Sequence, residues 1–131
     1  MNKGQRLYKF ILGLLMPFLF LACSSKERIK IDGGTFNVDG KDVQLICGEM
    51  HYARIPHEYW RDRLKRARAM GLNTISVYVF WNFHERQPGE FDFSGQADVA
   101  EFVRLAQEEG LYVILRPGPY ACAEWDFGGF L

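Results

Sequence analysis

The chain has 131 residues, of which 48% are hydrophobic and 24% charged, a composition typical of one globular domain. Sixteen basic and sixteen acidic residues give a formal net charge of zero, which removes the electrostatic basis for binding nucleic acid and favours neutral ligands. Aromatic residues make up 15% of the chain, and a hydrophobic core or a sugar-binding surface would each account for this share.

Residues 1–23 have the features of an export signal. Three basic residues precede the apolar run 10–21, and Cys23 follows a small residue. The run is shorter than the roughly 20 apolar residues that a membrane span needs, and Cys23 stands where a bacterial lipoprotein carries its lipid. We expect an exported protein that is anchored to the membrane through Cys23, with residues 24–30 as a tether. An ordinary cleaved signal and an uncleaved anchor are the alternatives.

Residues 35–47 predict a β-hairpin that leads into a strand. Apolar and polar residues alternate around Asp39-Gly40, which is a strong signal for a two-residue hairpin turn. The second arm continues through the apolar residues 45–47, the first candidate core strand. Polar residues follow this strand at once, among them His51.

Two amphipathic helices are predicted. The first begins at Pro56 and ends at Gly71. Its inner face is expected to consist of Tyr59, Trp60, Leu64, Ala67 and Met70. Basic residues cover its other faces, which we interpret as a solvated surface and not as a phosphate or membrane site. The second helix covers about 97–109 and ends at Gly110, and its expected inner residues are Val99, Phe102, Val103 and Ala106.

The apolar segments 72–80 and 111–115 have the composition of parallel strands buried on both faces. Strands that alternate with helices in this way predict an α/β fold with parallel crossovers. The glycine-rich turn of a dinucleotide-binding sheet is missing, and functional-looking residues follow all three strands, as in a barrel. We expect the first three βα units of a (β/α)8 TIM barrel, preceded by a β-hairpin. Three units cannot close a barrel, so the barrel is incomplete.

The segment 116–129 combines a carboxylate, a thiol, aromatic rings, an arginine and glycines directly after an apolar strand. Such a loop suits a sugar, which offers hydroxyls for hydrogen bonds and an apolar ring face for stacking. Among the aromatic residues, Tyr78 at the end of its strand and Trp125 in the long loop are the candidate sugar contacts.

Glu85 and Glu124 follow neighbouring predicted strands and are candidates for a catalytic pair. Glycoside hydrolysis requires one carboxyl group that protonates the leaving oxygen and one that attacks the anomeric carbon. The alternative is that each carboxylate holds substrate hydroxyls or pairs with a nearby arginine. The candidate arginines are Arg54, Arg86 and Arg116.

A zinc site at the strand ends would use His51, His84 and Cys122. These residues lack a tight metal-ligand spacing, so hydrogen bonds to substrate or to a buried carboxylate are the favoured interpretation, and no metal is expected. Cys47 and Cys122 are expected to be free thiols, the first packed in the core and the second lining a site.

Four long segments follow one another along the chain: Gly48–Pro56, Gly71–Ile75, Tyr78–Glu85 and Arg116–Gly129. In this order they closely resemble the motifs of glycoside hydrolase family 35, the retaining β-galactosidases, and the likeness extends over about residues 33–131. The resemblance implies a (β/α)8 barrel followed by β-rich domains. It also implies release of terminal β-galactose through a covalent glycosyl-enzyme, without a metal or organic cofactor.

The resemblance assigns roles to individual residues. Tyr78 matches a tyrosine that contacts galactose, and Cys122, Ala123 and Glu124 match a segment whose backbone and carboxylate hold the sugar hydroxyls. The acid/base glutamate of the family lies at the end of the fourth strand and the nucleophile at the end of the seventh. Both are therefore expected beyond Leu131.

On this resemblance Glu85 has a structural role and Glu124 a binding role. Residues 31–131 are then expected to be the N-terminal part of the catalytic domain, inactive alone, in an enzyme whose ligand is a β-galactoside glycan. Two other functions stay open, namely a non-catalytic sugar-binding fragment and a metal-dependent barrel hydrolase.

Overall fold

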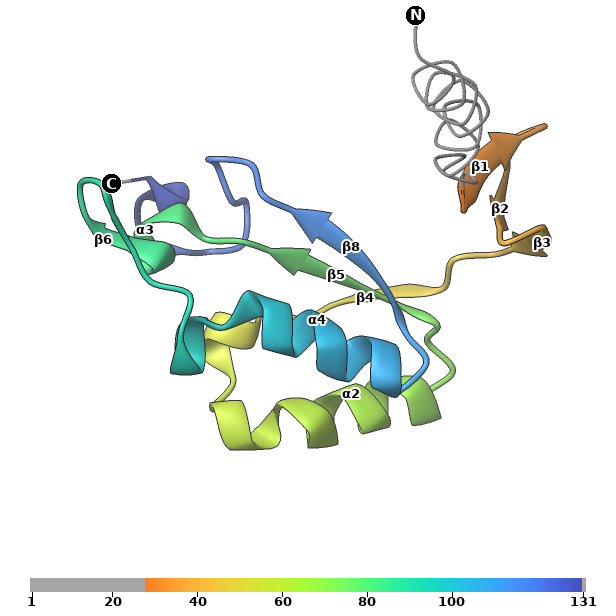
Figure 1. Ribbon diagram of the computed structural model, residues 1–131, viewed down its shortest axis with the longest axis horizontal. Helices are drawn as coiled ribbons and strands as arrows, with labels where there is room; N and C mark the ends of the chain where they lie inside the picture. Colours follow the sequence, from red (N-terminus) through yellow and green to blue (C-terminus); the bar gives the residue numbers. More distant parts are fainter. Residues whose placement is uncertain (1–27, 131) are drawn as a thin grey trace, which may run out of the picture. The chain divides into compact units, whose positions relative to one another are not determined.

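The computed structural model describes residues 28–130. The predicted export signal with Cys23, and residues 24–27 of the predicted tether, lie outside the described residues. The chain divides into two compact units, one that ends at Gln44 and one that begins at Leu45, and each is described by itself (Figure 1).

The first unit is a three-stranded antiparallel sheet of β1 (Ile29–Asp32), β2 (Thr35–Val38) and β3 (Lys41–Val43), in that order. The predicted hairpin is confirmed, because β2 and β3 pair with Val38 opposite Lys41. Asp39 (φ 51°) and Gly40 (φ 85°) both have positive φ, as the tight turn requires. Strand β1 was not expected, and its first two residues belong to the segment predicted as a tether.

The second unit contains a parallel sheet with the strand order β4-β5-β8. The strands are β4 (Cys47–Glu49), β5 (Thr74–Tyr78) and β8 (Tyr112–Arg116). The helices α2 (Trp60–Ala69) and α4 (Val99–Glu108) connect them and lie on the same face of the sheet (Figure 1). The predicted alternation of parallel strands and helices is thereby confirmed, and the described residues include no closed barrel.

Short elements connect these strands and helices. After β4 the chain forms the 3₁₀ turns η2 (Tyr52–Arg54) and η3 (His57–Tyr59). After β5 it forms the helical turn α3 (Trp81–His84), the hairpin of β6 (Glu85–Gln87) and β7 (Glu90–Phe91), and the 3₁₀ turn η4 (Gly95–Ala97). The turn η5 (Asp126–Gly129) follows β8. Within residues 28–130, no helix has the length and apolar character that crossing a membrane requires.

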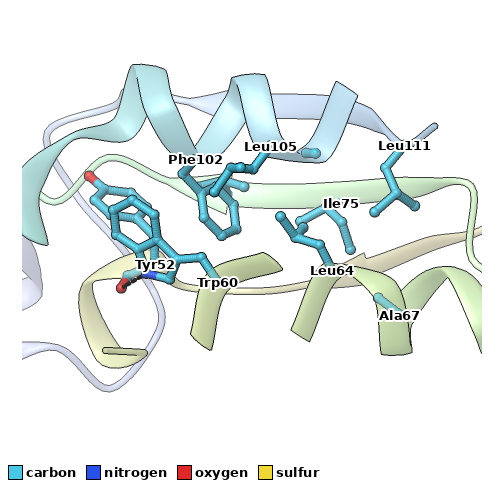
Figure 2. Packing of buried hydrophobic residues seen from close by; sticks show 10 residues of the cluster. Tyr52, Trp60, Leu64, Ala67, Ile75, Phe102, Leu105 and Leu111 are labelled. Atoms are coloured by element: carbon cyan, nitrogen blue, oxygen red, sulfur yellow. Dashed lines mark hydrogen bonds between the residues drawn. The ribbon is translucent and has the colours of Figure 1, made fainter. Parts of the chain in front are cut away.

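The core lies between the two helices and the sheet (Figure 2). Its largest fully buried side chains are aromatic, and Trp60 meets Phe102 and Tyr52 edge to face. The other buried members are Leu64, Ala67, Ile75, Val77, Leu105, Ala106 and Leu111. Helix α4 starts where the Asp98 side chain accepts a hydrogen bond from the Glu101 amide at 2.8 Å, a normal N-cap.

Four details of the predicted packing were wrong. Strand β8 is not buried on both faces, since Tyr112, Ile114 and Leu115 are 41%, 40% and 47% exposed on this outer strand of the described sheet. Tyr59 and Met70 are 54% and 79% exposed, because they lie just before and just after α2 and not on its inner face. Leu105 was not expected in the core, yet it is buried, one turn from Phe102. Cys47 is exposed and not packed in the core, because it lies on the sheet face opposite the helices.

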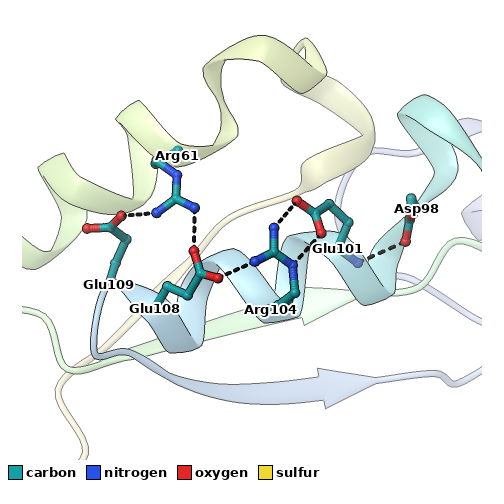
Figure 3. Close-up of polar contacts among 6 residues, drawn as sticks. All are labelled: Arg61, Asp98, Glu101, Arg104, Glu108 and Glu109. Carbon is teal, nitrogen blue, oxygen red and sulfur yellow. Dashed lines mark hydrogen bonds and ion pairs between the residues drawn. The ribbon is translucent and has the colours of Figure 1, made fainter.

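The basic residues of α2 form a solvated surface, as predicted. Arg61 makes ion pairs with Glu108 and with Glu109 (2.6 Å), so it connects α2 to α4 (Figure 3). Arg104 pairs with Glu101 and Glu108 along α4. Solvent screens these ion pairs because their side chains are partly exposed, so the apolar contacts dominate the docking of the two helices.

Candidate functional site

Charged and aromatic side chains gather where the parallel strands end. Tyr78 of β5 lies opposite Arg116 of β8, and Ser76 lies opposite Glu49 of β4. Side chains alternate between the faces of a strand, and Val77 packs into the core beneath the helices. Tyr78, Arg116, Ser76 and Glu49 therefore lie on the sheet face that points away from the helices, near the carboxyl ends of the strands.

Arg116 reaches across the central strand. Its guanidinium carbon lies 3.9 Å from the centroid of the Tyr78 ring, and its Nη1 lies 3.1 Å from Oε1 of Glu49. The side chains of Arg116 and Glu49 are 46% and 44% exposed, whereas Tyr78 is only 5% exposed. An ion pair between the two outer strands thus crosses over a buried tyrosine of the middle strand.

His51 follows β4 and lies beside this ion pair. Its Nε2 is 3.9 Å from Oε2 of Glu49, and its Nδ1 is buried without a hydrogen-bond partner. Burial lowers the pKa of His51, and the charges of Arg54 and Arg116 act in the same direction, whereas Glu49 opposes them. The neutral imidazole is therefore favoured at neutral pH.

The loop after β8 is held by an arginine from the loop after β4. Nη2 of Arg54 donates hydrogen bonds to the carbonyl oxygens of Ala123 at 2.7 Å and of Glu124 at 2.6 Å. Glu124 has a φ of 51°, an uncommon value for a residue with a side chain. Its side chain and that of Cys122 are exposed, and Ala123 packs against Tyr78 and its neighbours. The structure thus brings all four predicted sugar-binding residues to one end of the sheet.

Trp125 fastens the same loop to the segment after β5. Its ring stacks on Phe80 with centroids 4.0 Å apart, and its Nε1 donates to Oδ1 of Asn82 at 2.7 Å. The Arg54 guanidinium lies 5.3 Å from the Trp125 centroid. The ring is therefore committed to packing within the protein, and this geometry gives no support to the expected sugar contact of Trp125.

Glu85 is a structural residue in this arrangement. It is 7% exposed and accepts hydrogen bonds from Nε1 of Trp81 at 2.5 Å and from the Gly89 amide at 2.7 Å. The alternative that Glu85 or Glu124 pairs with an arginine was wrong: within residues 28–130, neither carboxylate forms an ion pair with Arg54, Arg86 or Arg116. Arg54 instead donates hydrogen bonds to backbone carbonyls, and the Arg86 guanidinium lies over the Phe83 ring. Arg116 forms its ion pair with Glu49.

His84 is part of the core and not a free ligand. Its Nδ1 lies 2.8 Å from the Asp92 carbonyl oxygen, which can only accept, so Nε2 accepts from the Tyr52 hydroxyl. Burial raises the pKa of Tyr52, which keeps that hydroxyl protonated. Within residues 28–130, no three His, Cys, Asp or Glu side chains are grouped to hold a metal ion. Cys47 and Cys122 are free, as predicted.

Sequence reasoning missed an aromatic cavity of about 180 Å³ next to the strand ends. Val79 and Pro117, which follow β5 and β8, line one part of it, and the remaining lining residues are Trp81, His84, Phe91 and Phe93. Trp81, Phe91 and Phe93 are 43%, 58% and 52% exposed. The sequence signal that could have indicated this cavity is Phe91 and Phe93, two aromatic residues in a segment of otherwise polar composition.

Residues 35–131 match the family model described as glycosyl hydrolases family 35. The chain is 54% identical over 119 residues to a β-galactosidase from Xanthomonas manihotis, which covers 91% of this chain and 20% of the relative. It is 53% identical over 118 residues to a β-galactosidase from Felis catus, which covers 88% of this chain and 18% of the relative. The chain thus spans about a fifth of the length of these relatives.

Two solved structures share the fold at low sequence identity. A β-galactosidase from the psychrophilic Marinomonas ef1 superposes with a TM-score of 0.53 and 23% identity, covering 63% of this chain and 12% of that chain. An endogalactoceramidase superposes with a TM-score of 0.56 and 21% identity, covering 73% of this chain and 24% of that chain. These likenesses concern the fold alone.

Replacing Arg54 with methionine is expected to loosen the loop 122–125. The substitution keeps the length of the side chain but removes two hydrogen bonds, each worth about 1 kcal/mol at this exposure. Hydrogen exchange of the full-length protein should show faster exchange of the loop amides. Arg66→Met, which removes an exposed ion pair to Asp62 on α2, is the matched control. Equal exchange in both variants would show that Arg54 does not hold the loop.

Proposed function

The chain belongs to glycosyl hydrolase family 35, and on this premise we propose that it forms the opening βα units of a (β/α)8 barrel in a retaining β-galactosidase. Two features support the barrel. The strands β4, β5 and β8 are parallel and adjacent, with both connecting helices on one face. Charged and aromatic residues gather at the carboxyl ends of these strands, where barrel enzymes build their sites.

The proposed ligand is the terminal β-galactosyl group of a glycan, held by Tyr78, Cys122, Ala123 and Glu124. The observation that carries this proposal is the placement of Glu124. Its carboxylate is exposed at the carboxyl edge of the sheet, while its backbone is fixed by Arg54. A carboxylate in a fixed position can accept hydrogen bonds from two neighbouring hydroxyls of a neutral sugar. The relatives named β-galactosidase point to galactose as that sugar.

We assign bond cleavage to residues outside this chain. A retaining glycosidase needs two carboxyl groups about 5–5.5 Å apart, one as acid/base and one as nucleophile. Glu85 is buried and accepts two hydrogen bonds from its own hairpin region, so it is not available for this chemistry. The acid/base and the nucleophile are therefore proposed to lie on the fourth and seventh strands of the complete barrel, beyond Leu131. No metal or organic cofactor takes part in this proposal.

The segment 1–23 is proposed to export the protein, and Cys23 to anchor it to a bacterial membrane through a lipid. The proposal is supported by the basic start, the apolar run 10–21 and the small residue before Cys23. Such an anchor would hold the enzyme at the cell surface or in the periplasm, where extracellular glycans are accessible.

Replacing Glu124 with glutamine should weaken substrate capture by the full-length protein. The change keeps the size of the side chain but removes the charge from its hydrogen bonds to sugar hydroxyls. We expect a loss of about 1.5–3 kcal/mol, or roughly 10- to 150-fold in kcat/KM for a nitrophenyl β-galactoside. Glu108→Gln, on the surface of α4, is the matched control and should leave kcat/KM unchanged. Wild-type kinetics for Glu124→Gln would remove Glu124 from the site.

The chain of 131 residues, expressed alone, should give no turnover in the same assay, because the acid/base and the nucleophile are assigned to later strands. Hydrolysis by this chain would contradict the assignment of the cleaving residues to later strands.

The lipid anchor is tested by labelling with palmitate in a bacterial host. We expect label in the wild-type protein and none in Cys23→Ser. Cys47→Ser is the matched control, since Cys47 is a free, exposed thiol within the described residues, and it should keep the label. An unlabelled wild-type protein, or label that persists in Cys23→Ser, would argue against lipidation of Cys23.

A further inference from the structure

We propose that Arg116 and Glu49 are positioning residues for Tyr78, an inference that rests on the sugar-binding role proposed above for that tyrosine. Their ion pair spans the outer strands β4 and β8, and the guanidinium lies over the Tyr78 ring of the central strand. The pair therefore fixes how Tyr78 meets the sugar, while neither Arg116 nor Glu49 has to touch it.

The geometry depends on the strand order. Because β5 lies between β4 and β8, an arginine on β8 can reach a carboxylate on β4 only by crossing the side chains of β5. Tyr78 is the register partner of Arg116, so its ring lies in that path. The distances of 3.9 Å from the guanidinium carbon to the ring centroid and 3.1 Å from Nη1 to Oε1 of Glu49 fit simultaneous contact with both groups.

Only arginine combines the two contacts. A guanidinium is planar, so it can lie flat over an aromatic ring and still direct N–H groups at its edge to a carboxylate. A lysine ammonium could pair with Glu49 but would not cover the ring. The ion pair and the ring contact therefore together hold Tyr78. Because an exposed ion pair contributes little to folding stability, the main effect of this one is on the position of Tyr78.

The other neighbours of Tyr78 complete its confinement. The ring of His51 has its centroid 5.8 Å from that of Tyr78, and the ring of Phe80 is 6.1 Å away. With these contacts and the guanidinium, Tyr78 is only 5% exposed. Because the neighbouring groups cover the ring, the hydroxyl is the part of Tyr78 that a sugar would use. A covered ring makes stacking of the sugar on Tyr78 unfavourable.

The test is a double-mutant cycle in the full-length protein with a nitrophenyl β-galactoside. Tyr78→Phe removes the hydroxyl, and Arg116→Met removes the charge and the planar group. We expect each single change to lower kcat/KM about tenfold, and the double change to lower it by about the same factor, because both remove one interaction. Two independent losses would instead multiply to about a hundredfold, and that additive result would overturn the proposal, as would wild-type kinetics for Arg116→Met.

Two further variants separate positioning from folding. Arg116→Lys keeps the charge opposite Glu49 but lacks the planar group, so it should fold like the wild type and still lower kcat/KM about tenfold. Wild-type kinetics for Arg116→Lys would overturn the proposal. Arg66→Met breaks an exposed arginine–carboxylate pair on α2 and should leave kcat/KM unchanged. A wild-type protein without galactosidase activity would overturn the proposed function, and this inference with it. If the wild type is active and the losses from Tyr78→Phe and Arg116→Met multiply in the double variant, only the positioning role is overturned.

Discussion

The parallel pairing of β4, β5 and β8 is the constraint on which the site depends. Parallel strands end at the same edge of a sheet, so residues far apart in the sequence become neighbours there. Glu49 and Arg116 are 67 positions apart and form an ion pair. Arg54 likewise holds the backbone of Glu124, 70 positions away. The helices bury the other face of the sheet, and the Glu49–Arg116 ion pair lies on the face that the helices leave uncovered.

The fold could be predicted where a local signal decided the structure. Asp39-Gly40 specified the hairpin turn, and the apolar segments around 72–80 and 111–115 contain the parallel strands. Strand β1 was missed although Ile29–Asp32 alternates apolar and polar residues, because a run of four residues is too short to specify a strand without its pairing to β2. The exposure of Cys47 was missed because a single apolar run does not say which of its residues face the helices.

The proximity of the predicted site residues could be expected from the sequence, but their contacts could not. The resemblance to family 35 placed Tyr78 and the segment 122–124 in the site, and the structure brings them to one end of the sheet. Residue types alone left Glu85 and Glu124 as a possible catalytic pair, and the resemblance gave Glu85 a structural role. The two hydrogen bonds that the buried Glu85 carboxylate accepts agree with that role. The Arg54 clamp and the stacking of Trp125 depend on tertiary geometry, which residue types alone do not specify.

The central claim is that the carboxyl edge of β4, β5 and β8 is the galactose site of a larger barrel. A crystal structure of the full-length protein with bound galactose tests it most directly. The proposed function predicts the sugar within hydrogen-bond distance of the Tyr78 hydroxyl and the Glu124 carboxylate, with Arg116 still over the Tyr78 ring. Galactose bound at a different surface, with Tyr78 and Glu124 out of contact, would contradict the claim.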